Sequence, residues 1–179
     1  VLWPEREDNW RNNADPAQAV FKQVIQTIAK YEPVVVGTNK DQYLNLLEMN
    51  MPNVQIVEIS NNDSWIRDTG ATFVIDGLGS MRAINWKFNA YGGLVNGLYF
   101  PWDQDAYIAT KMAAIEGVDY YHLTDFVLEG GSIHSDGEGT ILTTEETLLD
   151  PGRNPDMTKE QIEQMLKDYL GAEKVLWIP

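Results

Sequence analysis

The most informative absence in the 179-residue sequence is that of cysteine, which does not occur. Without cysteine the chain can form no disulfide, no thiolate metal site and no thiol nucleophile. Histidine occurs only twice, and no spaced set of metal-ligand residues is visible. The motifs of phosphate-binding loops and of the serine nucleophile elbow are missing as well. We therefore expect no metal and no cofactor.

Basic residues are also few, with 13 Lys and Arg against 27 Asp and Glu, for a net charge of -14. Nucleic-acid binding requires a basic face, so the charge argues against a nucleic-acid partner. An excess of carboxylates can steer a cationic ligand toward the protein. Acidic residues also keep many proteins soluble, so the charge alone leaves both explanations open.

Long apolar runs are absent too, since none reaches the roughly 18 residues that a membrane span requires. No basic segment followed by an apolar stretch marks a signal peptide. We therefore expect no membrane partner and a cytoplasmic location. Both ends have the pattern of interrupted strands, at Val1–Pro4 and Val175–Pro179, so we expect a chain that is truncated at both.

Hydrophobic residues make up 44% of the chain, enough for a real core, and their spacing predicts a mixed α/β fold. Helix–strand units alternate with hairpins in a loose repeat of about 60 to 80 residues. Asp15 is expected to cap the first helix and Thr158 the last. The expected helices are 15–32, 40–49, 103–116 and 158–170; the expected strands are 34–36, 54–59, 126–128 and 175–178; the expected hairpins span 73–86 and 133–143.

The Ser60–Asp68 loop follows a strand end, where α/β folds place functional residues. It contains Asp63, Trp65 and Asp68. A carboxylate matches the planar fork of a guanidinium, and an aromatic face can stack on the cation. The alternative is that the two aspartates cap turns and pair with Arg67.

Glu129-Gly130-Gly131 ends another apolar strand, where the carboxylate can be partly buried and the glycines permit close approach. Glu129 could orient a histidine or bind a cation, or it could be held by backbone amides of the following loop. His134 and Asp136 lie too close to a hairpin turn to suggest a catalytic pair, and His122 is expected to be a structural or surface residue.

The sequence resembles the agmatine deiminase family, also called the bacterial-type peptidylarginine deiminase-like family. The matching segments are Trp3–Arg6, Asp8–Arg11, Ser60–Gly70, Trp86–Gly93, Tyr99–Asp105, Phe126–Gly139, Leu142–Glu145 and Gly152–Pro155. They cover nearly the whole chain but only about the first half of the family's sequence. Tyr91 stands where the family has Trp.

The resemblance implies a pentein fold, of which this chain would contain about two to three ββαβ-type modules. Residues 1–179 would be the N-terminal part of a single catalytic domain, truncated at its C-terminal end. The missing modules would leave apolar surface exposed, so we expect a homo-oligomer or association with the missing half.

The resemblance also implies a reaction, in which a Cys thiolate attacks the guanidinium carbon of the small cation agmatine. Ammonia leaves, water releases N-carbamoylputrescine, and a His acts as general acid and base. Asp68 would be one of two carboxylates that hold the guanidinium, Glu129 would orient the His, and Trp65 would line the substrate channel. The second Asp, the His and the Cys belong to family segments that this sequence does not contain, so the chain alone would be inactive.

Two other functions remain open. The chain could be a non-catalytic module that binds a polyamine or assembles with a partner. It could also belong to another guanidine-modifying enzyme, an arginine deiminase or an amidinotransferase, although the segment around Trp65 is of the agmatine type.

Overall fold

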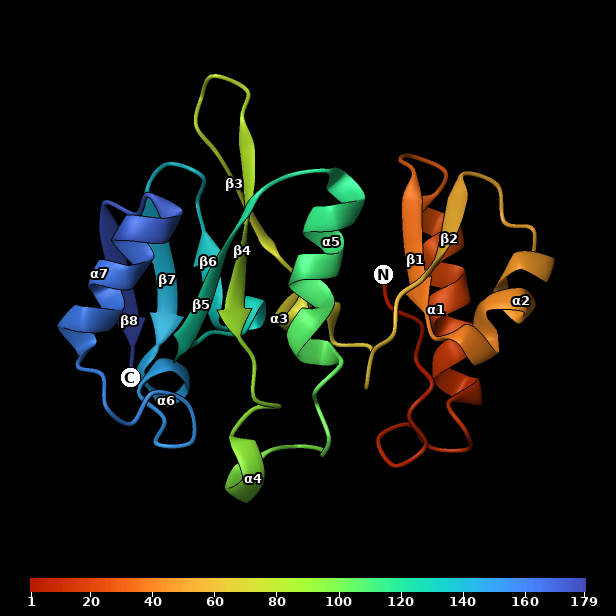
Figure 1. Cartoon of the computed structure of the whole chain (residues 1–179), viewed down its shortest axis with the longest axis horizontal. Helices are drawn as coiled ribbons and strands as arrows, with labels where there is room; N and C mark the ends of the chain where they lie inside the picture. The colour runs from red at the N-terminus through yellow and green to blue at the C-terminus, as the bar shows by residue number, and fades with distance from the viewer. The chain divides into compact units, whose positions relative to one another are not determined.

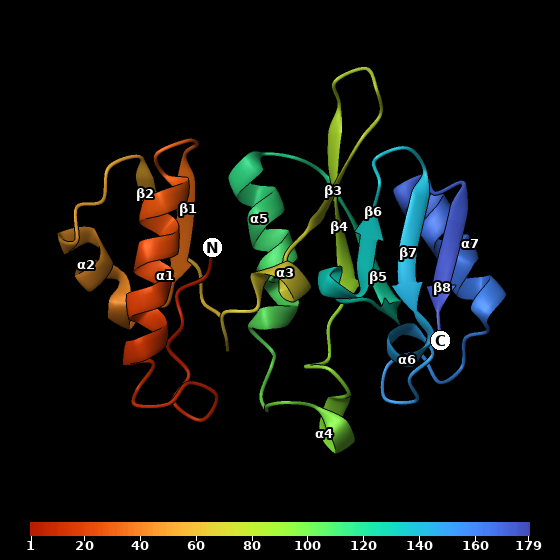
Figure 2. The ribbon, with the colours of Figure 1, turned by 180° about the vertical axis from the view of Figure 1, so that it is seen from behind.

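The computed structural model describes residues 1–179 and divides them into two compact units. The first unit comprises Val1–Ile66 with Pro101–Asp105, and the second comprises Arg67–Phe100 with Ala106–Pro179. Both units combine helices with strands (Figure 1, Figure 2), so the predicted α/β class is confirmed. No helix of the chain is both long enough and apolar enough to cross a membrane.

The first unit contains a two-stranded parallel sheet. Its elements are α1 (Asp15–Ile28), β1 (Val34–Thr38), α2 (Lys40–Glu48) and β2 (Val54–Glu58). Parallel strands cannot be joined by a tight hairpin, and α2 supplies the crossover between β1 and β2. The core of this unit is built from β1, both helices and the segments next to them. Its buried side chains are Trp3, Ile25, Val34, Val36, Leu46 and Met51.

The start of α1 differs from the prediction that Asp15 caps it. The N-cap residue is Ala14, with φ of 65° and no side-chain hydrogen bond to the helix. Asn12 and Asn13 also have positive φ, a conformation that asparagine tolerates better than most residues. Asp15 therefore lies in the first turn, where its carboxylate faces the positive end of the helix dipole.

The second unit contains the same module twice, a hairpin followed by a helix and a strand. In both copies the hairpin strands pair antiparallel, and the last strand pairs parallel to the second hairpin strand. The predicted hairpins and the ββαβ repeat are confirmed. The first copy is β3 (Thr72–Ile75), β4 (Met81–Lys87), α5 (Ile108–Glu116) and β5 (Tyr120–Val127); the second is β6 (Ile133–Ser135), β7 (Thr140–Thr144), α7 (Lys159–Leu170) and β8 (Lys174–Ile178).

One hydrophobic core joins the two copies of the module. Trp86 of β4 meets Phe126 of β5 edge to face at 5.7 Å, and α7 contributes Ile162 and Leu166 to the same cluster. The predicted start of α7 is confirmed, because Thr158 and its partner three residues later form a complete capping box. A shared core thus holds the strands of both copies together.

Several segments are more helical or more extended than predicted. α3 (Ile66–Thr69) and α4 (Gly93–Asn96) occupy segments that were expected to be loops. The expected helix 103–116 is instead a 3-10 turn, Asp105–Tyr107, followed by α5. β5 begins well before the expected strand, because its largely exposed first residues, from Tyr120 to His122, pair with β4. The remaining short turns are α6 (Glu145–Leu148) and a 3-10 turn at Gly130–Ser132.

The two hairpin turns share the pattern Asp-Gly-x-Gly-x, at Asp76–Ser80 and Asp136–Thr140. In the second turn the Asp136 carboxylate accepts the amides of Glu138 and Thr140 at 2.8 and 2.9 Å. Asp76 makes the equivalent bonds in the first turn. The backbone bonds lower the pKa of both carboxyl groups. These aspartates are therefore turn-forming residues.

We expect Asp136→Ala to lower the unfolding temperature at neutral pH, because two turn amides lose their acceptor. A lowered pKa stabilises the folded chain above the unfolded pKa, and this contribution is lost as the pH falls through the folded value. The difference from wild type should therefore shrink in acid. Thermal unfolding followed by circular dichroism tests this, with Glu138→Ala as the control, and an equal difference in acid would contradict it.

Candidate functional site

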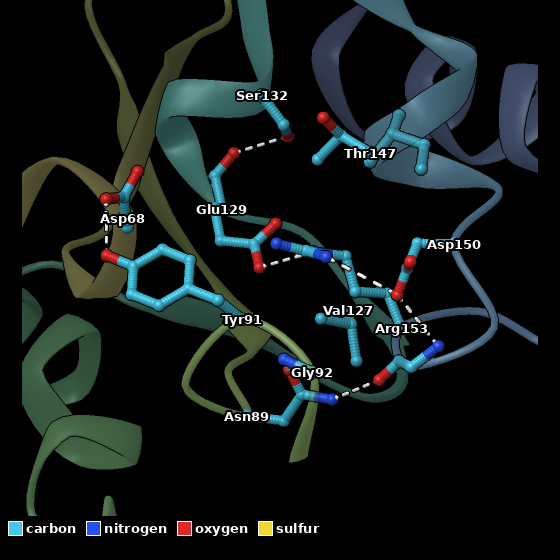
Figure 3. Close-up of polar contacts among 12 residues, drawn as sticks. Asp68, Asn89, Tyr91, Gly92, Val127, Glu129, Ser132, Thr147, Asp150 and Arg153 are labelled. Carbon is cyan, nitrogen blue, oxygen red and sulfur yellow. Dashed lines mark hydrogen bonds and ion pairs between the residues drawn. The ribbon is translucent and has the colours of Figure 1, made fainter. Parts of the chain in front are cut away.

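Asp68 lies in α3, and both oxygens of its carboxylate are held by neutral donors. Oδ1 accepts the backbone amide of Gly131 at 2.9 Å. Oδ2 accepts the hydroxyl of Tyr91 at 2.7 Å (Figure 3). Asp68 forms no ion pair within the chain. Each carboxylate oxygen can accept a further hydrogen bond, so Asp68 is fixed in place with its negative charge unpaired.

The glycines after Glu129 allow Asp68 to come this close. A Cβ atom on Gly131 would lie 2.6 Å from Oδ1 of Asp68, and a Cβ on Gly130 would collide with the carbonyl oxygen of Arg67. The prediction that the two glycines permit close approach is confirmed. What approaches them in this structure is α3 itself.

Glu129 follows β5 and is buried, with 3% of its surface exposed. Its Oε1 accepts the Nε of Arg153 at 2.8 Å, whereas its Oε2 is buried and has no hydrogen-bond partner (Figure 3). The main partner of Glu129 is thus an arginine. The alternative from the sequence, in which backbone amides of the following loop hold Glu129, is not what the structure shows. A buried carboxylate oxygen without a donor is uncommon in folded proteins.

The charges around Glu129 pull its pKa in opposite directions. Burial is the largest effect and raises the pKa of Glu129. The hydrogen bond and the positive charge of Arg153 lower it, and the negative charge of Asp68 raises it further. Glu129 and Asp68 therefore repel each other, and a cation placed between them would relieve that repulsion.

Arg153 is a site residue that was not singled out from the sequence. Besides Glu129, its guanidinium contacts Asp150, with Nη1 at 3.4 Å from Oδ1. The next residue, Asn154, is buried and bonds the backbone amide and carbonyl of Val127, at the end of β5. Asn154 thereby ties the segment that carries Arg153 to the strand that leads into Glu129.

Trp65 and Asp63 belong to the first unit, where Asp63 organises the loop. The Asp63 side chain accepts four donors: Asn9 Nδ2 at 2.5 Å, Trp10 Nε1 at 2.6 Å, Trp65 Nε1 at 2.7 Å and the amide of Ser64 at 2.8 Å. The rings of Trp10 and Trp65 stack at 5.4 Å with 24° between their planes. Asp63 therefore acts as loop support and fixes the orientation of Trp65.

The alternative in which the aspartates of this loop pair with Arg67 is wrong. The guanidinium of Arg67 donates instead to the carbonyl oxygen of Ile133 at 3.3 Å. The histidines behave as predicted from their positions. His122 lies in β5 and shares a hydrogen bond with Asn85, and His134 lies in β6 next to the Asp136 turn.

The fold and these residues can be compared with known proteins. The solved agmatine deiminase of Enterococcus faecalis matches with a TM-score of 0.96 and 52% identity, over 99% of this chain and 48% of that one. A Porphyromonas gingivalis protein solved as an arginine deiminase matches with a TM-score of 0.80 and 27% identity, over 99% and 52% of the two chains. The repeated module and these likenesses define a pentein-fold protein of the guanidine-modifying class.

The chain belongs to the Porphyromonas-type peptidyl-arginine deiminase family, whose model matches residues 1–179. A Latilactobacillus sakei protein named as an agmatine deiminase is 59% identical over 178 residues, which are 99% of this chain and 49% of that protein. A Streptococcus mutans protein of the same name is 56% identical and is covered to the same extent. The chain thus spans about half the length of the curated relatives it matches.

Proposed function

We propose that this chain supplies the guanidinium-binding part of an agmatine deiminase, which hydrolyses agmatine to N-carbamoylputrescine and ammonia. The observation that carries the proposal is the Asp68 carboxylate, which is fixed by Gly131 and Tyr91 and has no cationic partner. A guanidinium can donate two parallel hydrogen bonds to such a group. The names of the relatives support agmatine as the molecule that carries it.

Glu129 and Trp65 take distinct roles in this proposal. The unpartnered Oε2 of Glu129 is suited to accept the ring N–H of a histidine and so to orient that histidine for proton transfer. Trp65 has its ring orientation fixed by Asp63, which suits the aromatic wall of a substrate channel. Both assignments follow from the family resemblance and from these contacts.

The chain contains no cysteine, so the proposed thiolate nucleophile must come from residues outside this sequence. We therefore propose that the chain alone does not turn over agmatine and that it works in association with the rest of the domain, which would supply the thiolate. Exposed apolar side chains at Leu94, Val95 and Phe100 are compatible with such association. Detection of N-carbamoylputrescine above buffer controls with the purified chain would contradict this part.

The other two functions differ in the ligand that they require. A polyamine-binding module would bind putrescine, which has no guanidinium, as well as it binds agmatine. An arginine-directed enzyme would prefer arginine, whose carboxylate distinguishes it from agmatine. Calorimetric titration of the chain with agmatine, putrescine and arginine therefore separates the three functions, and a preference for agmatine supports the proposal.

We expect Asp68→Asn to weaken agmatine binding about 30-fold, the size of a lost charge-assisted hydrogen-bonded pair. Asparagine keeps the shape of the side chain but removes the charge and turns one acceptor into a donor. The measurement is calorimetric titration of the purified chain. The matched control is Asp119→Asn, which alters an exposed aspartate of the same unit and should leave the affinity unchanged. Equal affinities for wild type and Asp68→Asn would refute the assignment of Asp68.

A further inference from the structure

Tyr91 has a backbone conformation that tyrosine rarely adopts. Its φ is 72°, and the preceding Ala90 has φ of 54°. A bulky residue in this left-handed region is an outlier that persists only where its surroundings hold it there. Such strain often accompanies a functional requirement on the side chain.

The surroundings of Tyr91 do hold the loop firmly. Asn89 donates from Nδ2 to the carbonyl of Gly152 at 2.8 Å, and its own carbonyl accepts the amide of Gly93 at 2.8 Å. The carbonyl of Ala90 accepts the amide of Leu98 at 2.8 Å. The loop is therefore anchored on both sides of Tyr91 and beside the segment that carries Arg153.

Packing does not explain the hydroxyl of Tyr91. The ring meets Phe88 edge to face at 5.5 Å, a contact that a phenylalanine would make equally well. The hydroxyl instead donates to Oδ2 of Asp68 at 2.7 Å. A tyrosine at this position therefore gives Asp68 a hydrogen bond that a phenylalanine would not.

The nature of the donor is as important as its position. Glu129 is held by the positively charged Arg153, which compensates its charge, whereas Asp68 is held by a phenol and an amide, which do not. A neutral donor can fix the rotation of a carboxylate while leaving its full charge for a ligand. A cationic donor at the same place would compete with the ligand.

We propose that Tyr91 is a positioning residue that orients the Asp68 carboxylate for a guanidinium and thereby sets the affinity for it. The inference rests on the proposed function, because it assigns Tyr91 to the same ligand. With Tyr91 and Gly131 each using one acceptor position, the carboxylate cannot rotate, and its remaining acceptor positions stay directed at the ligand.

The first test needs no ligand. Loss of the hydroxyl in Tyr91→Phe leaves Asp68 tethered only to the Gly131 amide, so that amide should exchange with solvent about fivefold faster. Exchange is measured residue by residue by NMR on the purified chain. In the Asp68→Ala background the same tyrosine substitution should change Gly131 exchange by less than about twofold, because the side chain through which it acts is gone.

The second test uses agmatine. Calorimetric titration should show about fivefold weaker binding by Tyr91→Phe than by wild type, as for the loss of one neutral hydrogen bond. The matched control is Tyr121→Phe, which removes the hydroxyl from another ring-packed tyrosine of the same unit. It should change neither the affinity nor the Gly131 exchange, and thermal unfolding of each variant confirms that it folds.

The outcomes separate this inference from the proposed function. Faster Gly131 exchange together with weaker agmatine binding in Tyr91→Phe supports it. Unchanged Gly131 exchange overturns it, whatever agmatine does, and so does faster exchange with unchanged agmatine affinity. If the wild-type chain itself does not bind agmatine, the proposed function fails for this chain, while the exchange experiment still decides whether Tyr91 positions Asp68.

Discussion

Replacing Arg153 by methionine is expected to lower the free energy of unfolding by about 3 kcal/mol at neutral pH, because it leaves a buried carboxylate without its partner. Glu129 is 3% exposed, and the Nε of Arg153 is the one donor to its carboxylate from another side chain. Methionine retains the apolar stem, so the loss reports mainly on charge. Urea denaturation followed by tryptophan fluorescence measures it.

The loss should depend on pH. Burial raises the pKa of Glu129, Arg153 lowers it, and the charge of Asp68 raises it. Without Arg153 the pKa of Glu129 rises further. A group with a raised pKa contributes stability below its unfolded pKa, and that contribution is lost as the pH rises through the folded value. The variant should therefore approach wild type in acid, where Glu129 is protonated in both, and fall behind as the pH rises.

Two further variants identify the cause. Combining Glu129→Gln with Arg153→Met removes the buried charge along with its partner and should recover most of the lost stability. Arg82→Met alters an exposed arginine, 45% accessible, that lies 3.8 Å from Asp119, and should cost less than about 0.5 kcal/mol. Equal losses in Arg153→Met and Arg82→Met would contradict the burial argument.

The regular elements of the fold followed from local patterns in the sequence. The apolar stripe and capping box predict α7, and two Asp-Gly turns predict the hairpins, because each depends on residues within a few positions of one another. The first part of β5 was missed for a tertiary reason. Its side chains are largely exposed, so they give no pattern of buried residues, although Tyr120 and Tyr121 are of a type that strands favour. The pairing with β4 that fixes the strand joins segments far apart in the sequence.

The two carboxylates of the candidate site could be predicted from the sequence, but the residues that hydrogen-bond to them could not. Glu129 stands at the end of an apolar strand and next to two glycines, and Asp68 closes a loop that follows a strand end, so each has a local signal. Tyr91 and Arg153 lie 23 and 24 residues from their partners, and only the fold brings the pairs together. The resemblance contained both residues within matching segments without indicating what they contact.

The two carboxylates of the site are held in opposite ways, and this difference fits their proposed roles. Arg153 compensates the charge of Glu129 and leaves one oxygen open, as suits a group that orients another protein side chain. The neutral donors on Asp68 leave its charge uncompensated, as suits a group that binds a cation. One carboxylate has a cationic partner and the other has only neutral donors. This contrast supports distinct roles more strongly than either residue does alone.

Asp63→Ala is expected to lower the free energy of unfolding by about 4 kcal/mol, because a buried carboxylate with several donors is lost at once. Asp63 is 1% exposed and accepts side-chain bonds from Asn9, Trp10 and Trp65. Without it, both indole N–H groups must find water, and the Trp10–Trp65 stack should loosen. Urea denaturation measures the stability, and near-ultraviolet circular dichroism reports on the coupled indoles.

A graded series sharpens this prediction. Asp63→Asn keeps the shape and one acceptor oxygen but turns its amide toward other donors, so it should cost about half as much as alanine. Asp41→Ala removes an exposed carboxylate from the first turn of α2 in the same unit and should cost less than about 1 kcal/mol. If Asp63→Ala is as mild as Asp41→Ala, or leaves the indole signal intact, then Asp63 does not support the loop. The orientation of Trp65 would in that case have to come from ring packing on Trp10 alone.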